Sequence, residues 1–490
     1  MNSLRFNLNG EWIELADVPP TLTMLRFLRD RKGLAGTKEG CAEGDCGACT
    51  VAVVERNADG SAAYRAINSC LLLLPMVQGK HVVTVEALKD VKSGAYHPVQ
   101  DAMSKALGSQ CGYCTPGVVM TLFEATYRKD LTAEWKLEDQ LCGNLCRCTG
   151  YRPIRDAAKV TAGTCPADRF STGLEARLPT GMALNYSFEG QTLVTPTSLP
   201  ELWNAIDEHP TARFVSGGTD LSLEITKKFE RIEKLVLLEG LPELKRLKND
   251  ASGSFIGSGV TISELEDFSE KPLPPVHRMV RYFGARQIKH RGTVGGSLCT
   301  ASPIGDLAPV FIALGADALL VSRAGIRRLP LHEFFVSYRK TALQPGEILL
   351  GLWVPPLAPT TRALAYKVSK RRELDISTVA AGLLLETNAD NVVTTARFAF
   401  GGMAATPKRA AAAENAVLNK VWSRETAEAA AREIANDFKP MADHRGSAEY
   451  RALVAANLIR GFFAETFDIP QPALKAQHAG TVQTPEELKS

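Results

Sequence analysis

The sequence predicts an α+β protein built from several domains, and three observations support this prediction. At roughly 100 to 200 residues per domain, its 490 residues correspond to about three or four domains. A hydrophobic fraction of 45% and a charged fraction of 23% are typical of globular chains that bury a core. Strand-type alternation and helix-type spacing of apolar residues both recur along the chain, without a repeat of solenoid period.

The charge balance and the cysteine usage limit the class of protein. The 57 Lys and Arg against 54 Asp and Glu give a net charge of +3, which is too small to indicate binding to nucleic acid or to an anionic membrane. The first ten residues alternate between apolar and polar instead of forming the apolar stretch of an export signal. No apolar run reaches the ~20 residues of a transmembrane helix. We therefore expect a cytoplasmic protein with neither a nucleic-acid nor a membrane partner. Thiols stay reduced in the cytoplasm, so clustered cysteines indicate metal ligands rather than disulfides.

The first domain is expected at residues 1–90. Two alternating runs flank Asn9-Gly10, which favours a hairpin because a type I′ turn needs positive φ at both central residues. The expected elements are a hairpin of residues 4–8 and 11–15, a helix over about 21–31, and strands at 50–54 and 82–85.

Composition and periodicity divide the rest of the chain. We expect a helical domain at 91–165, a Pro- and Gly-containing linker at 166–190, a mixed α/β domain at 191–356, an α+β domain at 360–468 and a tail at 469–490. In the mixed domain the pattern predicts strands at 214–215, 235–238, 255–256, 319–321 and 348–352, and helices at 199–208, 262–268 and 309–314. In the following domain it predicts strands at 364–368, 378–386 and 392–401, followed by helix to about 466.

The first cysteine cluster contains Cys41, Cys46 and Cys49, and Cys70 follows at a distance. This C-x4-C-x2-C…C spacing is that of plant-type ferredoxins, which bind a 2Fe-2S cluster. Glycines at 40, 44 and 47 give the loop unusual φ values and let backbone N–H groups approach the sulfurs. The alternatives are a zinc knuckle or incidental loop cysteines, although zinc sites favour paired C-x2-C arms.

The second set contains Cys111, Cys114, Cys146 and Cys148. By spacing alone, C-x2-C…C-x-C can hold zinc as easily as an iron-sulfur cluster.

A third feature lies at residues 213–221, where a strand is followed by a glycine pair and a carboxylate. The backbone N–H groups of such a turn could bind a pyrophosphate. So short a pattern is also that of an ordinary tight turn.

Longer motifs carry a family resemblance. Cys111-Gly-Tyr-Cys-Thr-Pro-Gly117, Gly143-Asn-Leu-Cys-Arg-Cys-Thr-Gly-Tyr-Arg-Pro153 and Phe283-Gly-Ala-Arg-Gln-Ile-Lys-His-Arg-Gly-Thr-Val-Gly-Gly-Ser297 resemble the molybdenum hydroxylases, the xanthine dehydrogenase and aldehyde oxidase family. The resemblance covers essentially residues 4–465. It implies a β-grasp ferredoxin-like domain, a helical 2Fe-2S domain, an FAD-binding domain and a C-terminal flavoprotein domain, in that order.

The resemblance also implies the cofactor ligands. Two 2Fe-2S clusters would be held by Cys41, Cys46, Cys49 and Cys70, and by Cys111, Cys114, Cys146 and Cys148, leaving Cys142, Cys165 and Cys299 unused. The FAD contacts would be Val215, Ser216, Gly217, Gly218, Thr219, Asp220, Leu221, Phe283, Thr293, Gly296, Asp306, Leu349 and Lys367. The chain contains no G-x-G-x-x-G, so the resemblance implies that NAD+ binds at the flavin face near Tyr338.

The resemblance implies an electron-transfer subunit with no catalytic residue of its own, in which Phe283 and Tyr338 lie near the flavin. Its partner would be a large subunit carrying molybdopterin, which oxidises hypoxanthine or xanthine to urate, in a heterotetramer or larger assembly. Electrons would pass through the two clusters to FAD and NAD+. The alternatives are a related split enzyme acting on an aldehyde, CO or an N-heterocycle, or a non-catalytic iron-sulfur or zinc protein that binds or senses.

Overall fold

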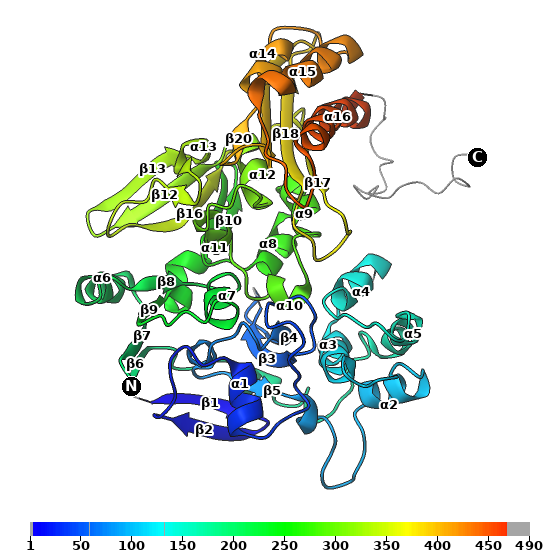
Figure 1. Ribbon diagram of the computed structural model, residues 1–490, viewed down its shortest axis with the longest axis vertical. Helices are drawn as coiled ribbons and strands as arrows, with labels where there is room; N and C mark the ends of the chain where they lie inside the picture. Colours follow the sequence, from blue (N-terminus) through cyan, green and yellow to red (C-terminus); the bar gives the residue numbers. More distant parts are fainter. Residues whose placement is uncertain (1–2, 58, 132, 468–490) are drawn as a thin grey trace. The chain divides into compact units, whose positions relative to one another are not determined.

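The computed structural model describes residues 3–57, 59–131 and 133–467, which form two compact units (Figure 1). The predicted tail at 469–490 lies outside the described residues. The first unit comprises Met1–Leu244, Thr261–Glu264 and Gly284–Gly296, and the second comprises Lys245–Val260, Leu265–Phe283 and Ser297–Ser490. Two helices, α8 (Ile262–Ser269) and α11 (Val294–Cys299), belong partly to each.

The chain opens with a mixed five-stranded sheet in the order β2-β1-β5-β3-β4. Its strands are β1 (Leu4–Leu8), β2 (Glu11–Leu15), β3 (Thr50–Arg56), β4 (Ala62–Asn68) and β5 (His81–Val83). The predicted hairpin is confirmed: Asn9 and Gly10 have φ values of 55° and 98°, as a type I′ turn requires. The parallel pairing of β1 with β5 inside an otherwise antiparallel sheet confirms the expected ferredoxin-like architecture.

The helix expected over residues 21–31 differs in form. A single α-turn, α1 (Met24–Arg26), is capped by the Thr23 hydroxyl and continues as a π-helix, η1 (Phe27–Arg31). The Lys32 amide donates to the Phe27 carbonyl, which is the i to i+5 bond of a π-turn. Apolar spacing over two turns predicts a helical face, but it does not distinguish an α-turn from a π-turn.

Four helices form the predicted helical region: α2 (Pro98–Lys105), α3 (Thr115–Tyr127), α4 (Glu134–Leu141) and α5 (Arg152–Thr161). They gather around α3, which lies beside β3 and β4 (Figure 1). Pro116 lies in the first turn of α3, where its missing N–H costs nothing. Because α3 packs against β3, β4 and the three other helices, nearly all of its residues are buried.

The first unit contains a second sheet in the order β6-β7-β9-β8. Its elements are β6 (Leu184–Phe188), β7 (Gln191–Thr195), β8 (Arg213–Val215), β9 (Lys234–Leu237), α6 (Leu199–Glu208) and α7 (Leu221–Thr226). Strand β6 falls within the range expected as a linker, where Tyr186 packs into the core shared with the first sheet. Short helices complete the unit: η2 (Leu74–Val77), η3 (Val85–Ala87), η4 (Leu174–Arg177), η5 (Leu238–Gly240), η6 (Pro242–Lys245, ending in the second unit) and α10 (Arg286–Lys289).

The second unit begins with a five-stranded antiparallel sheet in the order β10-β11-β16-β12-β13. Its elements are β10 (Leu247–Asp250), β11 (Gly253–Gly257), β12 (Asp317–Ser322), β13 (Gly325–Pro330), β16 (Ile348–Val354), α9 (Pro274–Val280), α12 (Leu307–Ala313) and α13 (Leu331–Phe334). A small hairpin pairs β14 (Phe335–Ser337) with β15 (Lys340–Thr341).

The last part of the second unit is a sheet in the order β17-β18-β19-β20 with three helices. Its elements are β17 (Arg362–Val368), β18 (Val379–Thr387), β19 (Val393–Gly401), β20 (Lys408–Arg409), α14 (Ala411–Val417), α15 (Arg424–Asp437) and α16 (Ala448–Phe467) (Figure 1). Alternate residues of β18, such as Leu383, join the core with α14, α15 and α16, whereas Gly382 faces α12. A strand covered on both faces is apolar throughout, which explains its unbroken hydrophobic sequence.

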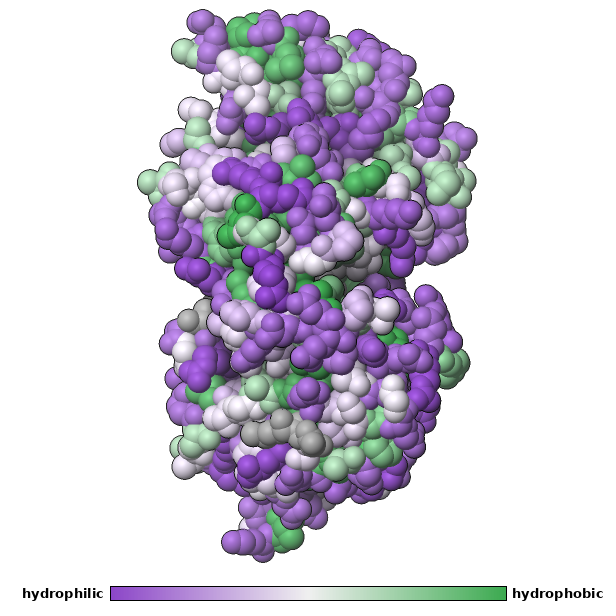
Figure 2. All heavy atoms as spheres, turned by 90° about the vertical axis from the view of Figure 1, so that its left-hand side faces the viewer, coloured by the Kyte–Doolittle hydropathy of each residue, from purple (hydrophilic) through white to green (hydrophobic). Residues whose placement is uncertain are grey.

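No helix in the described part of the chain is long and apolar enough to cross a membrane. On the face shown in Figure 2, hydrophilic side chains predominate and hydrophobic ones form small separate groups.

Candidate functional site

The first set of cysteines forms two thiol pairs in the first unit. Cys41, Cys46 and Cys49 lie in the loop before β3, and Cys70 follows β4. A hydrogen bond with the Cys46 thiol lowers the pKa of Cys41 to about 5, and the same bond raises the pKa of Cys46. Cys49 and Cys70 share a second such bond, which lowers the pKa of Cys49 and raises that of Cys70. The loop and Cys70 together therefore present four sulfurs in two pairs.

Backbone groups and glycines shape this loop. The Cys41 sulfur accepts hydrogen bonds from the backbone amides of Glu43 and Cys46, each at 3.4 Å. Gly44 and Gly47 have φ values of 88° and 67°, a region that other residues enter at a cost. Amide donors aimed at a sulfur stabilise the negative charge of a thiolate, as cluster-binding loops require.

The second set of cysteines also forms two thiol pairs. Hydrogen bonds with the Tyr113 backbone and with the Cys148 thiol lower the pKa of Cys111, and the bond to Cys111 raises the pKa of Cys148. Burial, followed by a hydrogen bond with Cys146, raises the pKa of Cys114 to about 12. Cys111 and Cys148 are exposed, whereas Cys146 is buried, so one edge of this site faces solvent.

Two pairs of sulfurs suit two iron ions, each bound by two thiolates. A single tetrahedral zinc instead requires its ligands to converge on one point. Both cysteine sets therefore fit a 2Fe-2S cluster.

The remaining cysteines have other surroundings. The Cys142 thiol donates to the Asp139 carbonyl at 3.1 Å, one turn back in α4. Burial raises the pKa of Cys299 to about 12. Cys165 has a φ of 44° and lies after α5. That none of the three is a cluster ligand stays a prediction.

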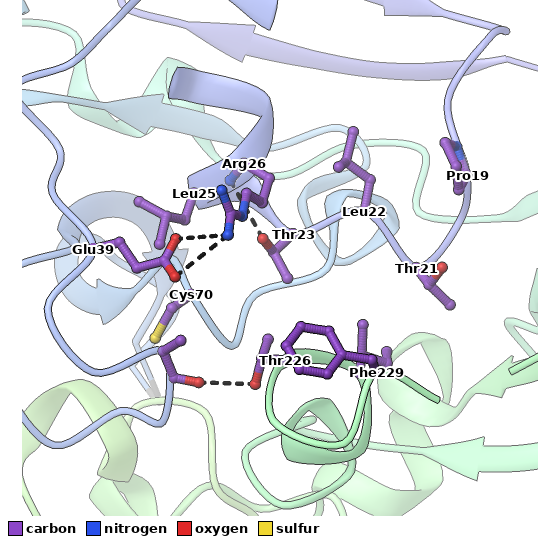
Figure 3. Close-up of a pocket in the computed structure, with 12 residues that line it drawn as sticks. Pro19, Thr21, Leu22, Thr23, Leu25, Arg26, Glu39, Cys70, Thr226 and Phe229 are labelled. Carbon is purple, nitrogen blue, oxygen red and sulfur yellow. Dashed lines mark hydrogen bonds and ion pairs between the residues drawn. The ribbon is translucent and has the colours of Figure 1, made fainter. Parts of the chain in front are cut away.

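A hollow of about 270 Å³ opens beside Cys70 in the first unit (Figure 3). Leucines 22 and 25 lie on one side, and Phe229, whose side chain is 85% exposed, lies on the other. The Arg26 guanidinium points toward the Glu39 carboxylate across the hollow's edge. Nothing in the sequence pattern predicted this opening next to a cysteine that is itself buried.

The glycine turn expected to meet FAD joins β8 to α7 in the first unit. A Cβ on Gly217 would lie 1.7 Å from the Arg291 carbonyl oxygen, and Gly218 has a φ of 78°. Only glycine fits either position, so the turn packs directly against the segment that carries Thr293. The Thr293 hydroxyl in turn accepts from the Gly296 amide at 3.0 Å. The structure thus brings together the 215–221 turn, Thr293 and Gly296.

The second unit carries the other predicted FAD residues. Asp306 and Lys367 form a buried ion pair with a distance of 2.7 Å between Oδ2 and Nζ. Lys367 also donates to the Tyr282 carbonyl, and the Ser377 hydroxyl donates to Asp306 Oδ1 at 2.6 Å. Both Asp306 oxygens are therefore engaged within the protein, which sequence patterns could not reveal because Ser377 lies 71 residues away.

Three further predicted residues of the second unit differ in exposure. Phe283 is half-buried at the end of the segment after α9, Leu349 is buried in β16, and Tyr338 is 59% exposed after β14. The exposed Tyr338 side chain can contact a ligand, whereas the buried Leu349 side chain packs within the protein.

Models of four protein families match the chain in sequence order. They are a 2Fe-2S iron-sulfur cluster binding domain at residues 6–74, a 2Fe-2S binding domain at 84–159, an FAD binding domain in molybdopterin dehydrogenase at 186–357, and a CO dehydrogenase flavoprotein C-terminal domain at 364–466. These domains place the chain in the molybdenum hydroxylase family, of which it carries the iron-sulfur and FAD portion.

Curated relatives are named xanthine dehydrogenase. The chain is 32% identical to one from Emericella nidulans, over 94% of its own length and 38% of the relative, and 32% identical to one from Oryza sativa subsp. japonica, over 85% and 36%. It is 30% identical to the xanthine dehydrogenase/oxidase of Rattus norvegicus, over 94% and 39%. The chain thus spans less than two fifths of the length of these relatives.

Solved structures match part of this chain. A carbon monoxide dehydrogenase chain from Hydrogenophaga pseudoflava superimposes with a TM-score of 0.52 at 26% identity, over 55% of this chain and 94% of its own length. A chain of quinoline 2-oxidoreductase from Pseudomonas putida 86 gives the same score at 24% identity, over 57% and 98%, and this likeness concerns the fold alone.

Proposed function

We propose that this chain is the electron-transfer subunit of a xanthine dehydrogenase. It would accept electrons from a separate molybdenum-cofactor subunit that oxidises hypoxanthine or xanthine to urate, and deliver them to NAD+. The observation that carries the proposal is the presence of two four-thiol sets, each in two pairs, on one chain with an FAD-binding domain.

The two thiol sets would hold the clusters through Cys41, Cys46, Cys49 and Cys70, and through Cys111, Cys114, Cys146 and Cys148. When bound, 2Fe-2S clusters carry single electrons, and a flavin collects two electrons for hydride transfer.

The protein supplies the surface through which electrons enter. Around the exposed Cys111 and Cys148 lie Tyr113, Leu145 and Tyr151, which are 50%, 39% and 39% exposed. Exposed aromatic and apolar side chains favour protein contacts, so we place the molybdenum subunit there, in a heterotetramer or larger assembly.

We assign the FAD contacts to the residues that the family resemblance implies. The 215–221 turn offers backbone amides where no side chain intrudes, which supports pyrophosphate binding. The complete set is Val215, Ser216, Gly217, Gly218, Thr219, Asp220, Leu221, Phe283, Thr293, Gly296, Asp306, Leu349 and Lys367. Within this set, Asp306 and Lys367 also bind one another, which fixes the positions of both side chains.

We assign NAD+ as the acceptor and place it near Tyr338, whose exposure supports a ligand contact. We also propose a cytoplasmic location, because thiols stay reduced there and clustered cysteines remain able to bind metal. The test is anaerobic addition of NADH to the purified chain, followed by its visible spectrum. Bleaching of the flavin and iron-sulfur bands is expected, because hydride transfer to FAD is reversible. Full flavin and iron content without bleaching would remove NAD+ as the acceptor.

The substrate is assigned from the xanthine dehydrogenase relatives at 30 to 32% identity. The alternative is a carbon monoxide or N-heterocycle oxidising enzyme, supported by the likeness to a carbon monoxide dehydrogenase chain. Co-purification with the molybdenum subunit separates the two, because the complex should reduce NAD+ with xanthine and not with CO or quinoline. The other alternative, a zinc protein that binds or senses, predicts zinc and no flavin in the purified chain.

A further inference from the structure

We propose that Lys80 and Glu239 are positioning residues for FAD, because they hold the turn of residues 215–221 in place. Both belong to a buried salt-bridge network of four side chains: Lys80, Arg291, Glu55 and Glu239. This inference rests on the proposed function, since it requires FAD to bind at this turn.

The turn packs directly on two other segments of the first unit. A Cβ on Gly217 would lie 1.7 Å from the Arg291 carbonyl oxygen. A Cβ on Gly218 would lie 2.6 Å from the Met76 Cε atom, which belongs to η2. Because neither glycine leaves a gap, a displacement of either segment disturbs the backbone amides of the turn.

Glu239 connects these two segments. Arg291, whose carbonyl oxygen meets the turn, binds Glu239 through both ends of its guanidinium, with Nη1–Oε1 and Nη2–Oε2 distances of 3.0 and 2.7 Å. Lys80 lies between η2 and β5, and its Nζ atom is 2.5 Å from the same Oε1 atom. Charge-assisted bonds of this kind are the strong ones, so one carboxylate holds both segments that touch the turn.

Glu55 of β3 balances the charge of the salt-bridge network. Its Oε1 atom lies 2.8 Å from Lys80 Nζ and 3.8 Å from Arg291 Nη1, so two cations face two anions. The side chains of Lys80 and Arg291 are 1% and 7% exposed. A buried salt bridge adds little net stability compared with apolar packing of the same volume, but it fixes the directions of its side chains. The network therefore suits a positioning role better than a stabilising one.

The network also reaches the strand that leads into the turn. Glu239 lies in η5, directly after β9, and β9 pairs in parallel with β8. Within this pair Val215, the first residue of the turn, lies opposite Leu237. The turn is thus held at its first residue and at its two glycines. A turn that is already fixed loses less freedom when it binds FAD, and tighter binding follows.

The test uses two variants of the full holoprotein. Glu239→Gln removes the anion that joins the segments. The double variant Lys80→Met/Glu55→Gln removes one cation and one anion, so it keeps the charge balance but breaks the link to η2. The readouts are the thermal unfolding midpoint and the dissociation constant of FAD, measured from the flavin fluorescence released when the holoprotein is diluted.

The matched control is Arg409→Met, which also breaks a pair of an arginine and a buried glutamate. Arg409 binds Glu414 through Nε at 2.9 Å and Nη2 at 2.7 Å, and neither residue is among the assigned FAD contacts. This control should lower the thermal unfolding midpoint and leave the dissociation constant of FAD unchanged.

We expect both network variants to raise the dissociation constant of FAD about fivefold or more, with unchanged iron content. The double variant should unfold at a higher temperature than Glu239→Gln, because its buried charges balance, and should still bind FAD weakly. A purely structural role predicts instead that FAD binding recovers together with stability. Where Glu239→Gln does not fold, the double variant decides.

Two results would overturn the proposal. One is an unchanged dissociation constant of FAD in the double variant, and the other is an equal increase in Arg409→Met. Absence of FAD from the unchanged protein would instead overturn the proposed function itself.

Discussion

At the scale of single residues, the first unit contains a buried ionic network that the sequence patterns did not predict. Glu124 on α3 is fully buried and lies 2.8 Å from His290 and 3.5 Å from Arg286. Burial opposes its ionisation, but these two neighbours hold the pKa of this carboxyl well below its usual value. Lys289 and Asp139 form a second buried pair at 2.8 Å. The basic side chains of α10 thus pair with the acidic side chains of the helices around the second thiol set. Such pairing is needed because a buried charge without a partner is costly.

His290 should make stability depend on pH. Burial lowers the pKa of His290 from 6.5 to about 3, against the opposing attraction of Glu124. Because the folded pKa lies below the unfolded one, His290 stabilises the fold above pH 6.5, and this contribution is lost as the pH falls toward 3. Between pH 7 and pH 5 the loss should be about 2 kcal/mol, from 1.36 kcal/mol per pKa unit. Urea unfolding of His290→Gln at both pH values should show a smaller decrease than the unchanged protein; equal decreases would contradict this role.

The Asp306–Lys367 pair in the second unit should behave as a buried ion pair. Lys367→Met leaves the Asp306 carboxylate without its cation, and we expect a cost of about 3 to 5 kcal/mol. Adding Asp306→Asn removes the stranded charge, so the double variant should be more stable than Lys367→Met alone. Thermal unfolding of the three proteins measures this difference. A double variant no more stable than the single one would show that the two side chains act independently.

At the scale of elements, a glycine in β18 determines how closely a helix can pack on the sheet. A Cβ on Gly382 would lie 2.5 Å from the Pro309 carbonyl oxygen and 2.6 Å from the Val310 Cα in α12. Both atoms belong to the backbone, so the helix itself must move. We expect Gly382→Ala to destabilise the protein by about 1 to 3 kcal/mol through overpacking.

Gly461→Ala is the matched control, because Gly461 lies in α16 and a Cβ there meets no atom within 4 Å. It should stabilise the helix by about 0.5 to 1 kcal/mol, since alanine loses less backbone entropy than glycine. Chemical denaturation of both variants measures the change in the free energy of unfolding, which should decrease for Gly382→Ala and increase for Gly461→Ala. Destabilisation of similar size in both would indicate a general effect of glycine replacement rather than close packing.

The elements also show what sequence patterns can predict. The Asn9-Gly10 hairpin and the buried strand β18 were predictable, because turn chemistry and apolar runs act locally. The π-turn of η1 was not, since the same apolar spacing suits an α-helix. Strand β6 was placed in a linker, because a short edge strand whose pairing partner is the neighbouring β7 has little pattern of its own.

At the scale of the whole molecule, the two thiol sets should bind their cofactors independently. Cys49→Ser removes a thiolate from the first set, so its cluster signal should be lost while the second signal and the flavin remain. The reciprocal variant Cys114→Ser should remove only the other signal. Low-temperature electron paramagnetic resonance distinguishes the two. Loss of both signals from either variant would contradict the division of the cysteines into two sites.

The candidate site was predictable only where its chemistry lies in contiguous motifs. Cysteine spacing identified the first four proposed ligands, and the family resemblance of the longer motifs assigned the other four. The structure adds their arrangement in pairs. The Lys80 and Glu239 contact escaped prediction because it joins residues separated by 159 positions, and neither residue type is distinctive in sequence.

The central claim is that one chain holds two 2Fe-2S clusters and one FAD. Its most direct test is the iron, acid-labile sulfide, zinc and FAD content of the purified chain, recorded with its reduced electron paramagnetic resonance spectrum. The account predicts about four irons, about four sulfides and about one FAD per chain, with two distinct cluster signals. Zinc in place of iron, or two clusters without flavin, would contradict it.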